Sequence, residues 1–326
     1  MNYNARRETV DGIEVVRLSD SASRTEVSIA PSIGNMAYEM LAGGRNILWF
    51  PYQSPAELKR QPALCGVPFL APWANRIDGE AYWANGKRYT LNPALGNLRR
   101  DGNGLPIHGL LNFSSAWTLV SVDAGDSSAS ASSLLEFWRR PGLMAQFPFA
   151  HSIAMTYRLA DGALEVETAI ENLSAEPMPL AIGYHPYFRL HDAPRDQWKV
   201  HIAARTRLEL NGRLIPTGQR VPAVFNGLHP LAAGPIDDVF TDLIREPDGT
   251  AVFRVEGQRQ AISVAYGPKY PIAVVYAPAG RDFICFEPMA AATNAFNLSH
   301  EGLCELQSIP PGGRWRESFR ISTVGF

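Results

Sequence analysis

The sequence has few cysteines and no excess of charge of either sign. Its three cysteines, Cys65, Cys285 and Cys304, are an odd number without C-x-x-C spacing, which argues against a disulfide framework and a structural zinc site. Thirty Lys and Arg residues against 32 Asp and Glu residues give a net charge of −2, so the chain lacks the basic surface that nucleic acid requires. We therefore expect a reducing compartment and no nucleic-acid partner.

Long hydrophobic runs are also absent. No stretch approaches the about 18 unbroken apolar residues of a membrane helix, and the N-terminal MNYNARRETVDG lacks the apolar segment of a secretion signal. These absences predict a cytoplasmic protein with no membrane partner. Hydrophobic residues still make up 46% of the 326 residues, which excludes wholesale disorder and supplies a core without disulfides or metal.

Helical periodicity is scarce, whereas strand-like runs recur along the chain. A short segment at Pro55–Lys59 is the one helix that we predict. Runs rich in β-branched and aromatic residues predict strands at Thr25–Ala30, Trp117–Val122, Trp198–Ala203, Ile262–Tyr266, Ile272–Tyr276, Phe283–Phe286 and Ser318–Val324. Strands that follow strands favour an antiparallel sandwich or barrel, so the predicted fold class is all-β.

Turn residues between these runs indicate β-hairpins. Asp161-Gly162 precedes an alternating strand, and the pairs Asn85-Gly86, Asn211-Gly212 and Asp248-Gly249 lie beside similar runs. The polar segment Asp123–Ser133 is interpreted as a loop between two strands. No linker divides the chain, so we expect a single domain over residues 1–326.

Two segments place polar residues inside apolar surroundings near the N-terminal third. In FLAPWANRIDG, Asn75 and Arg76 interrupt an apolar run, and in LPIHG, His108 precedes Gly109, a residue that permits close approach of backbone or ligand. A loop amide, a surface arginine and a buried core histidine are the alternative interpretations of these residues.

Two further segments place ionisable residues before prolines. His185 lies in LAIGYHPYF, where Pro186 predicts a strand end or bulge, and Glu287 lies in DFICFEP. A buried carboxylate there would have a raised pKa, which suits a base, although a salt bridge to a buried arginine would also explain it. In PIDDVF, Asp237 and Asp238 would face opposite sides of a strand, so one of them joins a given pocket.

Other catalytic patterns are missing. The serines lack a G-x-S-x-G elbow, and the histidines lack H-x-H and H-E-x-x-H spacing, which disfavours serine and zinc hydrolases. The polar residues of the four segments above therefore remain the candidates for a site.

Taken in order, the NRI, HG, HPYF, acidic-x-x-F and FEP elements resemble the aldose 1-epimerase (galactose mutarotase) family over roughly Asp11 to Thr323. The resemblance implies a large antiparallel β-supersandwich, a sugar substrate, and no cofactor or metal. It implies that His185 is the general acid and Glu287 the general base, and that the sugar-binding residues are Asn75, Arg76, His108 and Asp237, with Asp238 as the alternative to Asp237.

One position departs from the family pattern. Where we expect a glutamine two residues before Tyr276, this sequence has Val274, which bears on which sugar hydroxyls are recognised. The expected reaction is interconversion of the α and β anomers of a hexose. The alternatives are a hexose-6-phosphate 1-epimerase, with Arg99, Arg100 or Arg189 as the phosphate-binding cation, and a non-catalytic carbohydrate-binding β-sandwich. We expect a monomer or homodimer.

Overall fold

Alternation of buried and more exposed side chains along the chain builds the strands. It is clearest in β11 (His151–Ala160) and β12 (Ala163–Asn172), where buried and less buried positions alternate. In the computed structural model, which describes residues 2–225 and 227–326, these strands form an antiparallel hairpin. Asp161 and Gly162 take positive φ values of 50° and 71°, so the predicted tight turn is confirmed.

Within the described residues, the largest sheet has nine strands, and its ladders are antiparallel. Its order is β19 (His229–Pro230), β16 (Lys199–His201), β21 (Ala251–Glu256), β22 (Ala261–Tyr266), β26 (Arg314–Val324), β12, β11, β10 (Ala129–Glu136) and β9 (Thr118–Ala124).

A second antiparallel sheet carries the strands that matter most for function. Its order is β18 (Pro216–Pro222), β17 (Ala204–Leu210), β20 (Ile236–Leu243), β23 (Ile272–Ala277), β24 (Ile284–Met289), β14 (Gly183–Tyr184) and β6 (Phe69–Leu70), and β15 (Tyr187–Phe188) also pairs with β24.

The remaining elements are an N-terminal sheet, two strand pairs and short helices. The N-terminal sheet contains β1 (Tyr3–Val10), β2 (Ile13–Asp20), β3 (Thr25–Ala30), β4 (Met36–Ala42) and β5 (Arg45–Asn46). The pairs are β7 (Ala81–Ala84) with β8 (Lys87–Thr90), and β13 (Met178–Leu180) with β25 (Gln307–Ile309). The helices are α1 (Pro55–Arg60), α2 (Pro141–Met144) and α3 (Ala295–His300), with 3₁₀ turns at Pro93–Leu95, Phe137–Arg139, Arg195–Gln197 and Leu231–Ala233.

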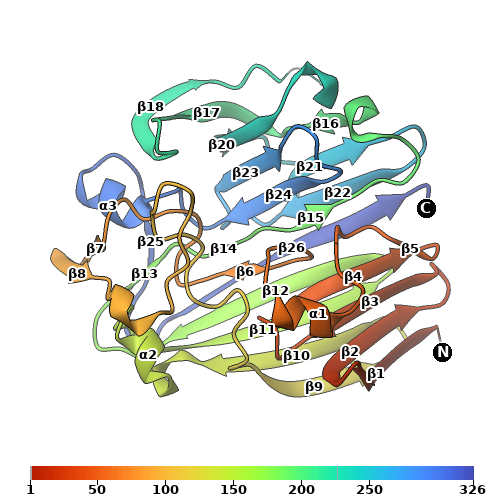
Figure 1. Cartoon of the computed structure of the whole chain (residues 1–326), viewed down its shortest axis with the longest axis horizontal. Coiled ribbons are helices and arrows are strands. Elements are labelled where there is room, and N and C mark those ends of the chain that lie inside the picture. The colour runs from red at the N-terminus through yellow and green to blue at the C-terminus, as the bar shows by residue number, and fades with distance from the viewer. Residues whose placement is uncertain (1, 226) are drawn as a thin grey trace.

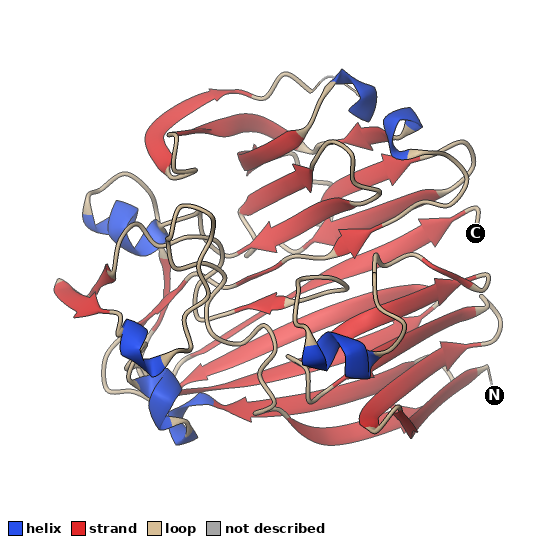
Figure 2. Cartoon of the chain, in the orientation of Figure 1, coloured by secondary structure: helices blue, strands red, loops and turns tan. Residues whose placement is uncertain are grey.

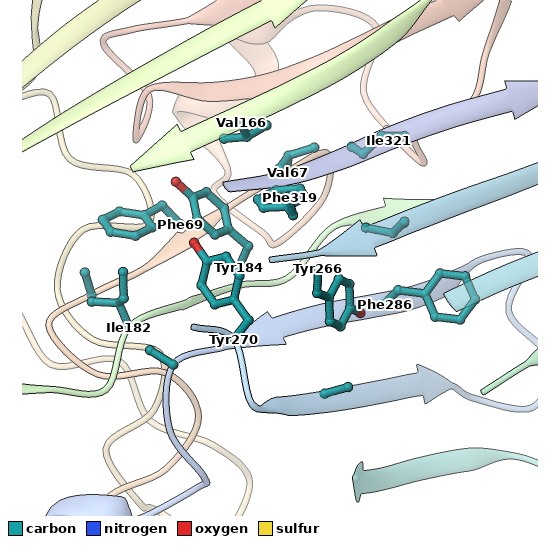
Figure 3. Close-up of a cluster of buried hydrophobic side chains, with 14 of the residues drawn as sticks. Val67, Phe69, Val166, Ile182, Tyr184, Tyr266, Tyr270, Phe286, Phe319 and Ile321 are labelled. Carbon is teal, nitrogen blue, oxygen red and sulfur yellow. The ribbon is translucent and has the colours of Figure 1, made fainter. Parts of the chain in front are cut away.

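The hydrophobic core forms where side chains of the two large sheets meet. Phe253 of β21 lies 6.1 Å from Phe286 of β24, and Tyr184 of β14 lies 4.8 Å from Phe319 of β26, between ring centroids. Figure 3 shows these side chains, apart from Phe253, gathered with other apolar residues between the strands. The second sheet therefore buries one face and leaves its other face free to form a site.

Strands dominate the molecule, as Figure 2 shows, and the all-β prediction is confirmed. Both chain ends lie on the same side of the molecule in Figure 1, and α2 and α3 lie at the opposite side. The predicted helix at Pro55–Lys59 is α1, but α2 and α3 were not predicted because each is too short to show a helical period. No helix in the described part of the chain is long and apolar enough to span a membrane.

Two local predictions are wrong. The segment Asp123–Ser133 is largely strand. Ala129, Ala131 and Ser133 are the buried positions of β10, and their small side chains hide the alternation from sequence analysis. Asp248-Gly249 forms a turn but not a hairpin, because the strands before and after it, β20 and β21, belong to different sheets. The pairs Asn85-Gly86 and Asn211-Gly212 do lie in hairpins, between β7 and β8 and between β17 and β18.

Candidate active site

The six residues proposed from the sequence converge on one cavity. It has a volume of about 230 Å³ and is lined by Asn75, Arg76, His108, His185, Asp237 and Glu287, together with Leu64, Ile107, Tyr187, Val274 and Tyr276. These residues come from distant parts of the chain. Their convergence was predicted only through the family resemblance.

The floor of the cavity is the free face of the second sheet. Glu287 of β24 lies opposite Val274 of β23, and Tyr276 of β23 lies opposite Asp237 of β20. Because side chains alternate along a strand, the neighbouring residues Ala273 and Val275 point into the core instead. The sheet therefore places two carboxyl groups on one face, with β23 between them.

Asp237, and not Asp238, faces the cavity. Asp238 points to the other side of β20, where its Oδ1 accepts a hydrogen bond from Arg207 Nη1 at 2.9 Å. Asp237 is the more solvent-exposed of the two carboxyl residues in the floor. Its surroundings nevertheless desolvate the carboxyl and raise its pKa, an effect that the Arg76 charge opposes.

His185 lies at the break between β14 and β15, as its position before Pro186 predicts. Its backbone N–H donates to the Pro68 carbonyl at 3.1 Å, and its ring stacks on Tyr187 with centroids 4.6 Å apart. His185 Nε2 lies 3.2 Å from Glu287 Oε1. The imidazole and the carboxyl are therefore in hydrogen-bond reach of each other in the floor of the cavity.

Asn75, Arg76 and His108 come from two adjoining loops. The His108 N–H donates to the Asn75 carbonyl at 2.8 Å, and both residues take left-handed φ values, 54° for Asn75 and 64° for His108. The predicted close approach at Gly109 is confirmed, because a Cβ there would lie 2.1 Å from the Ala71 carbonyl oxygen. This backbone geometry holds the His108 ring 5.4 Å from the His185 ring, between centroids.

Asp101 is a site component that the sequence analysis missed. Its Oδ2 accepts a hydrogen bond from Arg76 Nε at 2.7 Å, and its Oδ1 accepts from the backbone N–H groups of Asn103 and Leu105, each at 2.9 Å. The pairing holds the Arg76 guanidinium in place beside the cavity. A DG pair in DGNGL indicates a turn, but nothing local signals that the aspartate pairs with Arg76.

Burial shifts the ionisation of the central pair in opposite directions. It raises the pKa of Glu287 well above its ordinary value, with the Asp237 charge acting in the same direction and Arg76 opposing it. Burial lowers the pKa of His185 to about 3, with the charges of Arg99 and Arg76 acting in the same direction. The pKa of His108 is also lowered, mainly by burial and then by the charges of His185 and these arginines. The protein therefore favours an uncharged pair, a carboxylic acid beside a neutral imidazole. The two groups share one acidic proton, which is the proton of the carboxyl in this form.

Three buried polar atoms of the site lack a hydrogen-bond partner among the described residues. They are Nδ1 of His108, Nδ1 of His185 and Oε2 of Glu287. Buried polar atoms are nearly always satisfied, so such atoms at a cavity indicate the place of a polar ligand. Three such atoms would suit a ligand with several hydroxyl groups.

Two observations concern alternatives to this site. A larger cavity, of about 420 Å³, lies farther along the same sheet between Thr241, Ile272 and Leu303, but no histidine lines it. In residues 2–225 and 227–326, no three His, Cys, Asp or Glu side chains are grouped so as to hold a metal ion. The expectation of a reaction without metal or cofactor stays a prediction.

Known proteins resemble this chain in sequence over much of its length. The uncharacterized protein YphB of Escherichia coli is 26% identical over 253 residues, which cover 74% of this chain and 78% of YphB. The uncharacterized protein YihR of the same organism is 25% identical over 235 residues, which cover 70% of each chain.

Solved structures share the fold across the whole chain. A galactose mutarotase-like protein from Clostridium acetobutylicum superposes with a TM-score of 0.88 at 20% identity, covering 100% of this chain and 99% of that one. Galactose 1-epimerase from Lactobacillus acidophilus superposes with a TM-score of 0.78 at 14% identity, covering 99% of both. The expected galactose mutarotase-like architecture is confirmed. A sequence model of the family named aldose 1-epimerase matches residues 39–322, and the chain belongs to that family.

Proposed function

We propose that this protein interconverts the α and β anomers of an aldose by acid–base opening of the sugar ring. The observation that carries the proposal is the buried contact of 3.2 Å between His185 Nε2 and Glu287 Oε1, in a cavity lined by amide, guanidinium and imidazole groups. Such groups donate to and accept from hydroxyls, and the pair can move a proton between two sugar oxygens.

The reaction needs one group to remove a proton and another to supply one. A base takes the proton of the anomeric hydroxyl, the bond between C1 and the ring oxygen breaks, and an acid protonates the ring oxygen. The open aldehyde then rotates about its C1–C2 bond and closes with its other face, which returns both protons. General acid–base catalysis of this kind contributes roughly 10²–10⁴-fold in rate.

We assign the role of base to Glu287 and that of acid to His185. The pair holds a single proton, whether it lies on the carboxyl or on the imidazole, because burial disfavours both a free carboxylate and a free imidazolium. Transfer within the contact converts the neutral pair into carboxylate and imidazolium at the moment of reaction. The active protein therefore needs one acidic proton on the pair, and this proton can start on either residue.

The other cavity residues are proposed to hold the sugar. Arg76, which Asp101 keeps in place, lines the same cavity as Asn75 and His108. Asp237 lies on the other side of β23 from Glu287. An aldose bound at Glu287 would therefore present another of its hydroxyl groups to Asp237. These contacts bind substrate without taking a proton from it.

Two alternatives compete with this proposal. Of the three candidate cations for a sugar phosphate, Arg100 pairs with Glu80 and Arg189 with Asp282, which leaves Arg99. The charge of Arg99 acts on both histidines of the site, so a phosphorylated aldose is the second candidate, and the comparison with glucose 6-phosphate below tests it. A non-catalytic carbohydrate-binding protein would gain nothing from burying a carboxyl against an imidazole, since that burial disfavours the charged forms of both groups.

Polarimetry of freshly dissolved α-glucose, α-galactose and glucose 6-phosphate tests the proposal. We expect the protein to accelerate the rotation change of at least one free hexose, and we expect His185→Asn to abolish most of that acceleration. Glu14→Gln, which changes an exposed carboxyl on β2, is the matched control. No acceleration of any aldose would refute the proposed function, and a response to glucose 6-phosphate alone would favour the phosphorylated substrate.

A further inference from the structure

The cavity is lined by both polar and apolar side chains, and its floor contains an apolar residue between two carboxyl groups. Asn75, Arg76 and His108 come from the loops above the sheet, and Asp237 and Glu287 come from β20 and β24 on either side of β23. Between these two carboxyl groups, β23 contributes Val274. Its side chain lies directly across the ladder from Glu287 and is 5% exposed.

Apolar residues flank Val274 on the side of β20, while Glu287 lies on the side of β24. Val239 lies opposite it on β20, and the same cluster contains Leu70, Ile272 and Met289. All members of this cluster are hydrocarbon or thioether side chains. The Val274 side chain therefore offers no donor or acceptor to a sugar hydroxyl placed directly over it, and neither does Val239 beside it.

The residue type at this position has the same consequence. A side chain with an amide would offer both a donor and an acceptor to a hydroxyl. Val274 offers neither, and its methyl groups favour contact with a carbon that carries only hydrogen. An apolar position between two carboxyl groups favours a ligand whose carbon at that point carries no hydroxyl.

We propose that the substrate of this site is a deoxyaldose, whose ring or side-chain carbon over Val274 lacks a hydroxyl, and that Val274 is the residue that determines this specificity. The inference rests on the proposed ring-opening function and adds the class of substrate to it. An apolar site rejects an added hydroxyl only moderately, so the preference over the parent sugar is expected to be about 10-fold to about 100-fold in kcat/KM.

The test compares glucose and galactose with their 2-, 3-, 4- and 6-deoxy analogues, by polarimetry or by NMR of the anomeric protons, with the spontaneous rate subtracted. The wild-type protein should prefer one deoxy analogue to its parent. Val274→Thr adds a hydroxyl in nearly the same shape and should reduce this preference by about 10-fold or more. Val274→Ala, which stays apolar, should keep the preference.

Val239→Thr is the matched control. Val239 is 4% exposed, pairs with Val274 and belongs to the same apolar cluster, but it does not line the cavity, so its substitution should leave the preference unchanged. Circular dichroism verifies that each variant folds, and the wild-type comparison does not depend on any variant.

The outcomes separate this inference from the proposed function. If the protein accelerates mutarotation but prefers the parent sugar to all its deoxy analogues, the inference is wrong and the proposed function stands. An equal loss of the preference in Val239→Thr and Val274→Thr would also overturn it, because the effect would then come from the cluster and not from contact with the sugar. If no aldose is accelerated, both fail together.

Discussion

Glu287 shows at the scale of a single residue how a site can oppose stability. Burial, together with the Asp237 charge, raises its pKa above the ordinary 4.5, so the folded chain binds this proton more tightly than the unfolded chain does. The free energy of unfolding therefore falls as pH rises from 4.5 through the raised pKa. At neutral pH the carboxyl destabilises the fold that it serves.

Glu287→Gln should consequently be less active but more stable. We expect kcat to fall by about 10²–10⁴-fold, because the amide cannot accept the anomeric proton. The variant should resist denaturant better than the wild type at about pH 8, and the difference should shrink toward about pH 4.5. Polarimetry and urea unfolding at both pH values measure this, with Glu14→Gln as control. A variant with wild-type kcat would remove Glu287 as the base.

The pH dependence of activity should reflect the one proton that the pair holds. Its acid limb requires a second proton, and burial lowers the pKa of His185 to about 3, so activity should persist well below the ordinary histidine value of 6.5. Its alkaline limb marks loss of the only proton, whose binding burial strengthens. Measurement of kcat/KM against pH checks this, and an acid limb near 6.5 would contradict it.

Asp101 acts through Arg76 and not on the sugar. Asp101→Asn keeps an oxygen for the backbone N–H groups but removes the charge that holds the guanidinium. We expect KM to rise about 10-fold with little change in kcat, because a binding contact acts on substrate and transition state alike. Steady-state kinetics measure the split, and Asp126→Asn in an exposed loop is the control. An unchanged KM with a reduced kcat would assign Asp101 a different role.

At the scale of elements, the site depends on how closely two loops approach each other. Gly109 has a φ of 67° and packs against the Ala71 carbonyl, whereas Gly212 at the tip of the β17–β18 hairpin has open space around it. Gly109→Ala should destabilise the protein by about 2 kcal/mol or more and displace His108, while Gly212→Ala should do neither. Thermal unfolding and kcat/KM measure both effects. Equal stability of the two variants would show that the loop packing is looser than described.

At the scale of the whole molecule, one apolar cluster extends from Val16 near the N-terminus to Ile321 near the C-terminus. We expect it to make unfolding a single transition, as predicted for one domain over residues 1–326. Urea unfolding followed by tryptophan fluorescence and by circular dichroism should give coincident curves. Two separate transitions would divide the chain into two domains. The prediction of a monomer or homodimer is checked by light scattering in the same buffer.

Much of the fold could be predicted from the sequence because its signals are local. Alternation along β11 and β12 and the Asp161-Gly162 turn between them depend on residues that are neighbours in the chain. His185 and Glu287 also stand out locally, since each is an ionisable residue between apolar ones and before a proline. Their common location followed from the order of motifs that resembles the family.

Other features required the tertiary structure. Whether Asp237 or Asp238 faces the cavity, which carboxylate holds Arg76, and which side chain lies opposite Glu287 all depend on the register of strands and loops far apart in sequence. Register is set by the packing of whole sheets, and a shift of one residue would turn each side chain to the other face. The strands and the reactive groups on them follow from local sequence. Which of those groups meet follows from the folded molecule, because contact between distant residues depends on every ladder between them.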